Sequence, residues 1–270
     1  MALRINSNVD AMAAHRHLSQ TSDKISQSME RLSSGLRINK AADDAAGLGI
    51  SEKMRGQING LAQAQRNIQD SVSMVQTAEG NLDEVHSILQ RVRELAVQYK
   101  NGSLGPAGKA AIQSEVNQLA SEIDRIGKMA QFNGISLLDG TGGTNGAVSF
   151  QIGANDGEVL SISFPDLAAK VGTAWVDLGS ATISDIDAAI DAVTDVRSGF
   201  GAVQNRLDHA LSVTGVYQEN LTSAESRIRD VDMAEEMVEL TKNQILQQAG
   251  TAMLAQANQA PQSVLSLLQR

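Results

Sequence analysis

Apolar residues recur at heptad spacing along most of this chain, interrupted by short polar segments. The longest run keeps an apolar residue at every seventh position. Its members are Met54, Leu61, Ile68, Val75, Leu82, Leu89 and Ala96. A repeat of seven is typical of helices that pack along a seam against partner helices. The pattern predicts one helix of about 55 residues, which would extend about 80 Å.

Shorter runs with the same spacing lie on both sides of the long one. Their members are Ala11, Leu18, Ile25, Met29, Leu32 and Leu36; Ile112, Val116, Leu119, Ile123 and Ile126; Ile186, Val193, Phe200, Leu207, Thr214, Leu221 and Ile228; and Leu246, Met253, Ala257, Ala260, Val264 and Leu267. Each run predicts a helix whose apolar seam needs a partner.

The breaks between these runs carry turn and strand signals. Residues 101–106 (Asn-Gly-Ser-Leu-Gly-Pro) end the long helix, and Pro106 is suited to open the next one. Alternating apolar residues in 148–152 and 159–164 flank the turn signal 155–157, which predicts a β-hairpin. Thr182 or Ser184 is expected to cap the returning helix. The predicted fold is mainly α: a long antiparallel helical bundle or coiled-coil rod, with a small β-hairpin region and both termini at one end.

The C-terminal segment differs from an ordinary surface helix. Residues 243–269 contain no charged side chain, and their polar positions are Gln, Asn, Ser and Thr. A solvated helix usually carries Lys and Glu on its outer face, whereas buried charge is costly and amides can hydrogen-bond within protein. We therefore interpret both ends as assembly surfaces. The alternative is an ordinary intramolecular coiled coil between the two ends.

Composition narrows the function classes. The 270-residue chain is 42% hydrophobic but only 3% aromatic, contains three prolines and has no cysteine. This suits packed helices and excludes disulfides and thiolate metal sites. The net charge of −9 argues against nucleic acid as a partner. No apolar run is long enough for a membrane span, and the N-terminus has no secretory signal pattern.

Motifs for catalysis or cofactors are weak. His15 and His17 are two positions apart, so on a helix they point in different directions and cannot share a metal. The pair Asp43–Asp44 lies among small residues and is expected to act as a cap or linker. The sequence therefore predicts no enzyme activity, no metal site and no cofactor.

The two ends resemble bacterial flagellin. The stretches 30–39 (Glu-Arg-Leu-Ser-Ser-Gly-Leu-Arg-Ile-Asn) and 42–47 are similar to the family's N-terminal signature, and 244–250, 254–258 and 264–268 to its C-terminal one. The resemblance implies a terminal coiled-coil assembly domain, 1–44 with 230–270, that lines the inner tube of a filament. It implies a helical outer domain, 45–229, with the hairpin near 147–164. The residues expected to build the inner tube are Leu18, Ile25, Leu32, Leu36, Leu246, Met253, Leu254, Val264, Leu267 and Leu268.

The same resemblance implies partners and a location. Flagellin-like proteins polymerise with copies of themselves for swimming motility, with an export chaperone, hook-junction proteins and a cap protein as further partners. They are secreted to the flagellum without a cleaved signal peptide. The alternatives are a hook–filament junction protein, whose ends are flagellin-like, and a secreted helical binding protein.

One segment of the long helix resembles a recognition motif. Residues 89–98 (Leu-Gln-Arg-Val-Arg-Glu-Leu-Ala-Val-Gln) are similar to the flagellin segment that Toll-like receptor 5 of hosts binds. The resemblance implies contacts by Leu89, Gln90, Arg91, Arg93, Leu95 and Glu115. The arginines would make charge-assisted hydrogen bonds and Leu95 would supply the apolar contact. The alternative is a helix surface whose role is packing between protofilaments.

Overall fold

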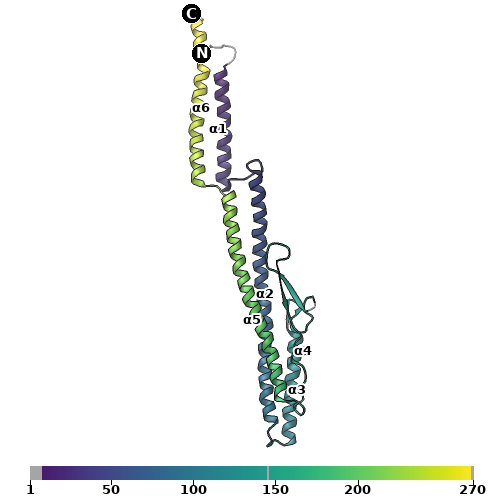
Figure 1. The fold of residues 1–270 in the computed structure, drawn as a ribbon. Coiled ribbons are helices and arrows are strands. Elements are labelled where there is room, and N and C mark those ends of the chain that lie inside the picture. Colours follow the sequence, from purple (N-terminus) through teal and green to yellow (C-terminus); the bar gives the residue numbers. More distant parts are fainter. Residues whose placement is uncertain (1–7, 145, 269–270) are drawn as a thin grey trace. The chain divides into compact units, whose positions relative to one another are not determined.

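The computed structural model describes residues 8–144 and 146–268, with side chains described up to residue 259. The helices are α1 (Val9–Ser34), α2 (Ala45–Tyr99), α3 (Pro106–Met129), α4 (Leu167–Val171), α5 (Ile183–Arg229) and α6 (Met233–Leu268). The strands are β1 (Gln131–Phe132), β2 (Ile135–Ser136), β3 (Ala147–Gln151) and β4 (Val159–Ser163). The mainly helical fold with a small hairpin region is confirmed (Figure 1).

The chain divides into two compact units. The terminal unit contains Met1–Arg55 and Leu221–Arg270, and the central unit contains Gly56–Asn220. The two units share α2 and α5, because each of these helices begins in one unit and ends in the other.

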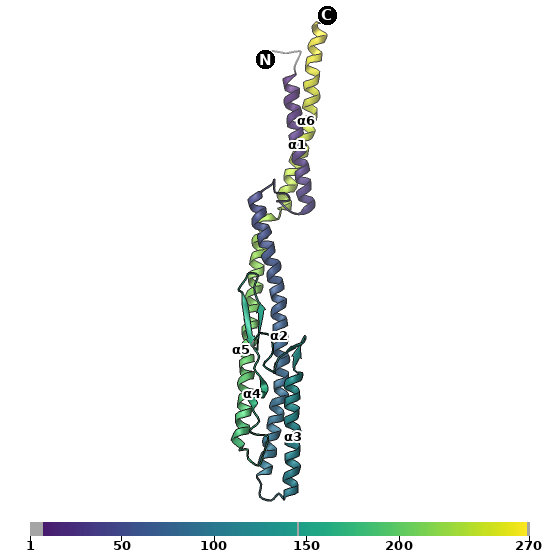
Figure 2. The ribbon, with the colours of Figure 1, turned by 90° about the vertical axis from the view of Figure 1, so that its right-hand side faces the viewer.

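The central unit is built on the predicted heptad seams. Helices α2 and α5 run antiparallel, and α3 packs beside α2 (Figures 1 and 2). The seam residues of α2 and α5 are buried in one continuous core: Ile68, Val75, Leu82, Leu89, Ala96, Ile186, Val193, Phe200 and Leu207. Arg197 of α5 pairs with Asp83 of α2 at 3.0 Å, at the edge of this core. The heptad pattern therefore predicted the central packing correctly.

Helix boundaries follow the predicted capping signals. Pro106 occupies the first turn of α3. The Thr182 hydroxyl accepts a hydrogen bond from the Asp185 N–H at 3.2 Å, and the Asp185 carboxylate accepts one from the Thr182 N–H at 2.7 Å. This reciprocal pair is a capping box at the start of α5. At the start of α2, the Asp44 carboxylate accepts the N–H of Gly47 at 2.9 Å, which confirms the capping role expected for this aspartate.

The predicted hairpin is present, and two small elements beside it were not predicted. Strands β3 and β4 pair antiparallel, and the β4 residues Leu160 and Ile162 are buried. Strands β1 and β2 form a second, shorter pair around Asn133 and Gly134, both at positive φ, the backbone conformation of a two-residue hairpin turn. Helix α4 is a single short turn capped by Asp166. The two-residue strands β1 and β2 are too short to show alternation, and α4 is too short to show a helical period.

In the terminal unit, α1 and α6 lie side by side and antiparallel (Figures 1 and 2). Helix α1 ends at Gly35, whose φ of 72° is the left-handed conformation that favours glycine. Helix α6 begins after Asp232, whose carboxylate accepts the Ala234 N–H at 2.9 Å. The two ends of the chain thus pair within one subunit.

Candidate functional site

The terminal helix pair buries few apolar side chains. Leu18, Ile25 and Leu32 of α1 are only half-buried against α6, and Leu240 is the α6 residue that is buried among the described apolar side chains. A side-chain carbon added at Gly250 would lie 3.5 Å from a Leu18 methyl group, which is ordinary van der Waals contact, so Gly250 faces α1. The seam between α1 and α6 is therefore narrow.

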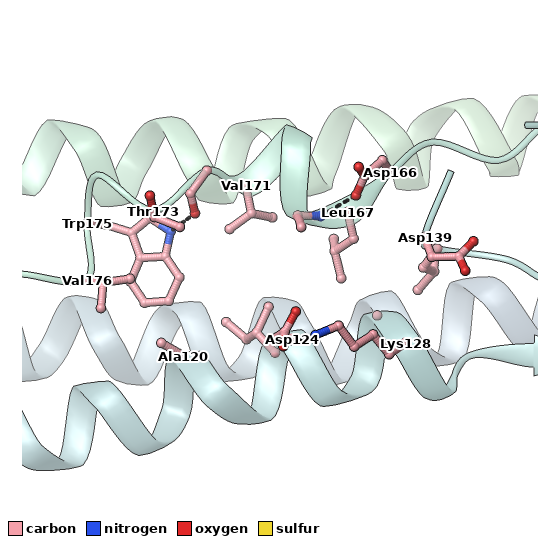
Figure 3. A pocket seen from close by; sticks show the side chains of 15 residues that line it. Ala120, Asp124, Lys128, Asp139, Asp166, Leu167, Val171, Thr173, Trp175 and Val176 are labelled. Carbon is pink, nitrogen blue, oxygen red and sulfur yellow. Dashed lines mark hydrogen bonds and ion pairs between the residues drawn. The ribbon is translucent and has the colours of Figure 1, made fainter. Parts of the chain in front are cut away.

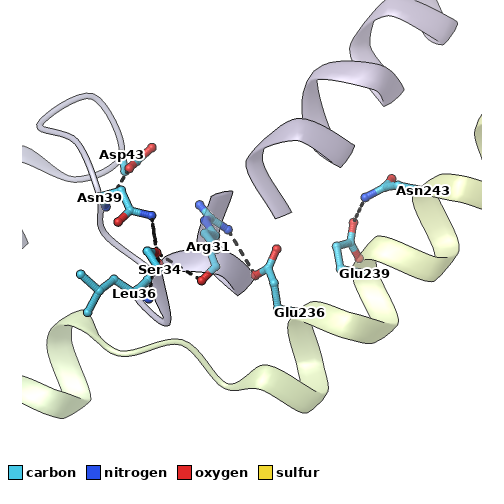
Figure 4. Close-up of polar contacts among 8 residues, drawn as sticks. All are labelled: Arg31, Ser34, Leu36, Asn39, Asp43, Glu236, Glu239 and Asn243. Carbon is cyan, nitrogen blue, oxygen red and sulfur yellow. Dashed lines mark hydrogen bonds and ion pairs between the residues drawn. The ribbon is translucent and has the colours of Figure 1, made fainter. Parts of the chain in front are cut away.

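Several positions in this seam are polar. Ser28, Glu236 and Asn243 are all buried. Glu236 faces Arg31, with 3.6 Å between the charged atoms, and the Asn243 amide donates to Glu239 at 3.3 Å (Figure 4). Polar groups at seam positions fix the register of a helix pair but reduce its stability. The pairing of α1 with α6 is accordingly specific but weakly stabilised.

A second apolar stripe of α6 is left uncovered. We call Val238, Ile245, Leu246 and Met253 the outer face of α6. Val238, Ile245 and Met253 are 70%, 62% and 66% exposed. On α1, Val9, Met12 and Met29 are also exposed. Exposed apolar residues that gather on one element mark an interaction surface, whereas scattered ones need no explanation.

This arrangement corrects one prediction. The heptad pattern placed Leu246 and Met253 in the pairing seam of the last helix, but both are exposed. The seam with α1 uses Leu240, Gly250 and Leu254 instead. Helix α6 has two apolar stripes at similar spacing, and α1 covers only one of them. Leu36 is half-buried in the turn after α1, and the side chains of Val264, Leu267 and Leu268 lie outside those described.

The turn between α1 and α2 ties the two chain segments together. The Arg37 N–H donates to the Arg229 carbonyl at 2.6 Å, and the Val231 N–H donates to the Gly35 carbonyl at 3.1 Å. Within the turn, the Asn39 amide donates to the Ser34 hydroxyl at 2.8 Å (Figure 4). The residues of the N-terminal signature therefore fix how the chain leaves α1 beside the start of α6.

Asp43 holds the same turn through its carboxylate. It accepts the backbone N–H groups of Lys40 and Asn39, at 2.9 and 3.0 Å, and these bonds lower the pKa of Asp43. Hydrogen bonds to the charged form favour ionisation. The stabilisation is therefore complete above the ordinary carboxyl pKa and is lost as the pH falls through the lowered one.

The polar residues of the recognition motif lie together on the central unit. The Arg91 guanidinium contacts the Glu115 carboxylate of α3 at 3.1 Å and the Glu94 carboxylate at 2.9 Å. Both acids raise the pKa of Arg91, with the Glu94 hydrogen bond as the largest cause. Arg93 pairs with Asp187 of α5 at 2.6 Å. Gln90, Arg91 and Arg93 are exposed, so they are available to a partner.

The apolar residues of that motif are not available. Leu89 and Leu95 are 0% and 2% exposed, and both belong to the core of the central unit. The prediction that Leu95 makes an apolar contact with a receptor is therefore wrong for the folded subunit. Leu89 lies on the heptad stripe of α2, and Leu95, next to the stripe member Ala96, is buried in the same core.

This correction predicts a stability difference between neighbouring residues. Leu89→Ala should lower the free energy of unfolding of the monomer by about 2–5 kcal/mol, because it removes buried methyl groups and leaves a cavity. Gln90→Ala, at the adjacent exposed position, should change it by less than about 0.5 kcal/mol. Chemical denaturation of the two variants measures both values. Equal, small effects would place Leu89 at the surface.

The described residues show neither a membrane-spanning helix nor a cluster of metal ligands. Within residues 8–268, none of the helices combines the length and apolarity of a membrane span. Among the same described residues, no three His, Asp or Glu side chains gather as metal ligands would. The terminal helix pair, with its uncovered outer face, is therefore the strongest candidate site.

Comparison with known protein families identifies the family of both helical segments of the chain. Residues 5–142 match the bacterial flagellin N-terminal helical region, and residues 183–268 match the bacterial flagellin C-terminal helical region. The flagellin of Halalkalibacterium halodurans is 53% identical, with 98% of this chain and 99% of the relative covered. The flagellin of Bacillus subtilis is 47% identical, with 98% and 100% covered.

Solved structures show the same fold. The crystal structure of Bacillus cereus flagellin is 34% identical and has a TM-score of 0.50, with 55% of this chain and 88% of that chain covered. A putative flagellar hook-associated protein from Vibrio parahaemolyticus has a TM-score of 0.56, with 70% and 98% covered. Its identity is 14%, so this likeness shows a shared fold alone.

The family assignment covers the helical segments at both ends and nearly the full length of the relatives. Flagellins are structural proteins that polymerise into the extracellular filament of the flagellum. This chain therefore belongs to the bacterial flagellin family, and it is a structural subunit of the flagellar filament rather than an enzyme.

Proposed function

We propose that subunits polymerise through the terminal helix pair, and that the outer face of α6 is the main surface buried between copies. The observation that carries this proposal is the exposure of Ile245 and Met253 on the part of α6, from Asn243 to Leu268, that has no charged residue. A helix that stayed in water would be expected to carry Lys and Glu there.

The free-energy balance favours ordering of α1 and α6 at the moment when subunits assemble. Fixing the backbone costs about 1–2 kcal/mol per residue. Full burial of a Leu, Ile or Met side chain contributes about 1.5–3 kcal/mol. The narrow seam between α1 and α6 supplies few such side chains, whereas neighbouring subunits would add the outer face. We therefore propose that residues outside about 45–230 become stably ordered only in the filament.

The proposal also gives the two parts of the chain different roles. Residues 1–44 and 230–270 form the assembly domain of the inner tube, and residues 45–229 form the outer domain. An interface between different patches of identical subunits generates a ring if its rotation closes and an open helix if it does not, and a filament requires the open case. Before assembly, the same apolar face would suit a flagellar export chaperone. We propose that the chain is exported without a cleaved signal peptide. Hook-junction and cap proteins would then bind the ends of the polymer.

Seeding tests the polymerisation proposal directly. Purified monomer is mixed with sheared filament fragments, and sedimentation measures the polymer formed over time. We expect pelleted protein only in the seeded sample at low concentration, because addition at a filament end presents a ready partner for the outer face. Monomer that stays soluble at every concentration with seeds would contradict the proposal.

A second proposed interaction involves Toll-like receptor 5 of hosts. The observation that favours it is the exposed cluster of Gln90, Arg91 and Arg93 beside Glu115. An arginine can make two parallel hydrogen bonds to a carboxylate, and such residues are common anchors at interfaces. In the free subunit Arg91 already contacts Glu94 and Glu115, so its side chain is held in place before binding.

Arg91→Ala is expected to weaken receptor binding by about 2 kcal/mol or more, the loss typical of an interface anchor. Arg66→Ala is the matched control, because Arg66 is an exposed arginine of the same helix that contacts Gln63. A binding titration of monomers with the receptor ectodomain compares the three proteins. Equal affinities for wild type and Arg91→Ala would remove this cluster from the interface.

A further inference from the structure

The central unit contains a half-open cavity that the assembly proposal does not use. It has a volume of about 370 Å³ and lies between α3 and the segment that holds α4 (Figure 3). This volume falls within the range of small-molecule sites, about 300–1,000 Å³. The cavity lies within the central unit, because all of its lining residues lie between Ala120 and Val176.

The inner wall of the cavity is apolar. Its buried side chains are Ile123, Leu138, Leu167, Val171 and Trp175. The Trp175 indole N–H donates to the Gly172 carbonyl at 3.0 Å, so it is not available to a ligand. Among the described residues, the buried side-chain atoms without a hydrogen-bond partner belong to His86 and Arg229, which do not line this cavity. The inner wall therefore suits a hydrocarbon or aromatic group.

The rim of the cavity is acidic. Asp124, Asp139 and Asp166 stand there with a single lysine, Lys128, whose ammonium already pairs with Asp124 at 2.6 Å. Two carboxylates, Asp139 and Asp166, remain without a cationic partner in the lining. Their backbones face each other across an isolated β-bridge, and Figure 3 shows both at the end opposite Trp175.

Both of these carboxylates are held in place by local hydrogen bonds. Asp139 accepts the Thr141 N–H at 2.9 Å and its hydroxyl at 2.7 Å, and these bonds lower the pKa of Asp139. Asp166 accepts the Ala168 N–H at 2.9 Å, which caps α4. The Thr141 bonds reach one oxygen of Asp139, which also hydrogen-bonds with Ser136, and the backbone bonds to Asp166 reach only one of its oxygens. A positive charge at the rim would therefore meet oriented carboxylate acceptors.

We propose that this cavity binds a small organic amine with an apolar or aromatic body. The body would lie against Leu167, Val171 and Trp175, and the ammonium group would lie near Asp139 and Asp166. A carboxylate ligand of the same shape is disfavoured, because it would bring like charges together at the rim.

The chain carries its own reporter for this proposal, because Trp175 is its only tryptophan. Full-length monomer is titrated with 4-phenylbutylamine, 4-phenylbutanol and 4-phenylbutyrate, and tryptophan fluorescence is recorded. We expect saturable binding with the order amine, alcohol, acid, and about a fivefold difference between amine and alcohol, the size expected for partly exposed charge pairs. Equal dissociation constants for the three probes, or no saturable change with any of them, would overturn the proposal.

Two sets of variants test separately how the apolar body and the ammonium group of the ligand contribute to binding. Ala120→Phe should abolish binding of the amine and the alcohol by filling the cavity beside Trp175. The double variant Asp139→Asn, Asp166→Asn should weaken the amine about fivefold and leave the alcohol unchanged; asparagine keeps the acceptor that caps α4. The control double variant, Asp156→Asn with Asp195→Asn, removes two exposed acids elsewhere and should bind like wild type. Equal weakening by the rim and control variants would show general charge attraction and overturn the site.

Discussion

Ile245→Glu is expected to prevent polymerisation while leaving the monomer folded. Ile245 is 62% exposed in the single subunit, so a charge there is solvated and should change monomer stability by no more than about 0.5 kcal/mol. In the filament the same charge would be buried without a partner, which costs several kcal/mol. Because 1.4 kcal/mol is tenfold in an equilibrium constant, the critical concentration should rise about 100-fold or more.

The measurement is the concentration of protein that stays soluble after seeded polymerisation. Ser103→Glu is the control, because it adds the same charge in an exposed loop of the central unit. It should polymerise nearly as wild type does. Circular dichroism of the monomers verifies that both variants keep their helices. If Ile245→Glu polymerises at the wild-type critical concentration, the outer face of α6 is not buried in the filament.

Deletion of residues 233–270 is expected to abolish polymerisation without destabilising the central unit. The continuous apolar core of the described structure runs from Ile68 to Leu207 and includes no residue of α1 or α6. Loss of α6 should therefore remove the assembly surface but leave that core intact. We expect no pelleted filaments at any accessible concentration.

Trp175 also makes this second prediction measurable, because it is buried in the central unit. Its fluorescence during chemical denaturation reports the stability of that unit in both the full-length and the deleted chain. The two midpoints should agree within experimental error. A large shift to lower denaturant would show that the central unit depends on α6, and filaments from the deleted chain would refute the assembly role.

Much of the central fold could be predicted from the sequence, because a heptad repeat reports burial averaged over many turns. The apolar seam from Leu61 to Ala96 is recognisable even where single positions depart from the repeat. The turn at 155–157 sets the position of the hairpin locally. Capping residues such as Thr182 act over one helical turn, so they are also readable without the tertiary structure.

The sequence-based predictions were wrong where more than one packing arrangement fits the same pattern of apolar residues. Helix α6 has two apolar stripes, and periodicity alone cannot say which one α1 covers. The recognition motif places Leu95 beside exposed arginines, but Leu95 belongs to the buried core of the central unit. The cavity beside Trp175 depends on contacts between α3 and a segment about 45 residues later, which no local pattern records.

The most direct test of the assembly proposal compares the accessibility of one α6 position in monomer and filament. The chain has no cysteine, so Ile245→Cys introduces a unique thiol in place of an exposed apolar side chain. Asp156→Cys, in the exposed hairpin turn, provides a control for reagent access. We expect the thiol at position 245 to react with a maleimide rapidly in the monomer and at least about tenfold more slowly in the filament, while position 156 stays reactive in both. Equal reaction rates at position 245 in monomer and filament would contradict the account.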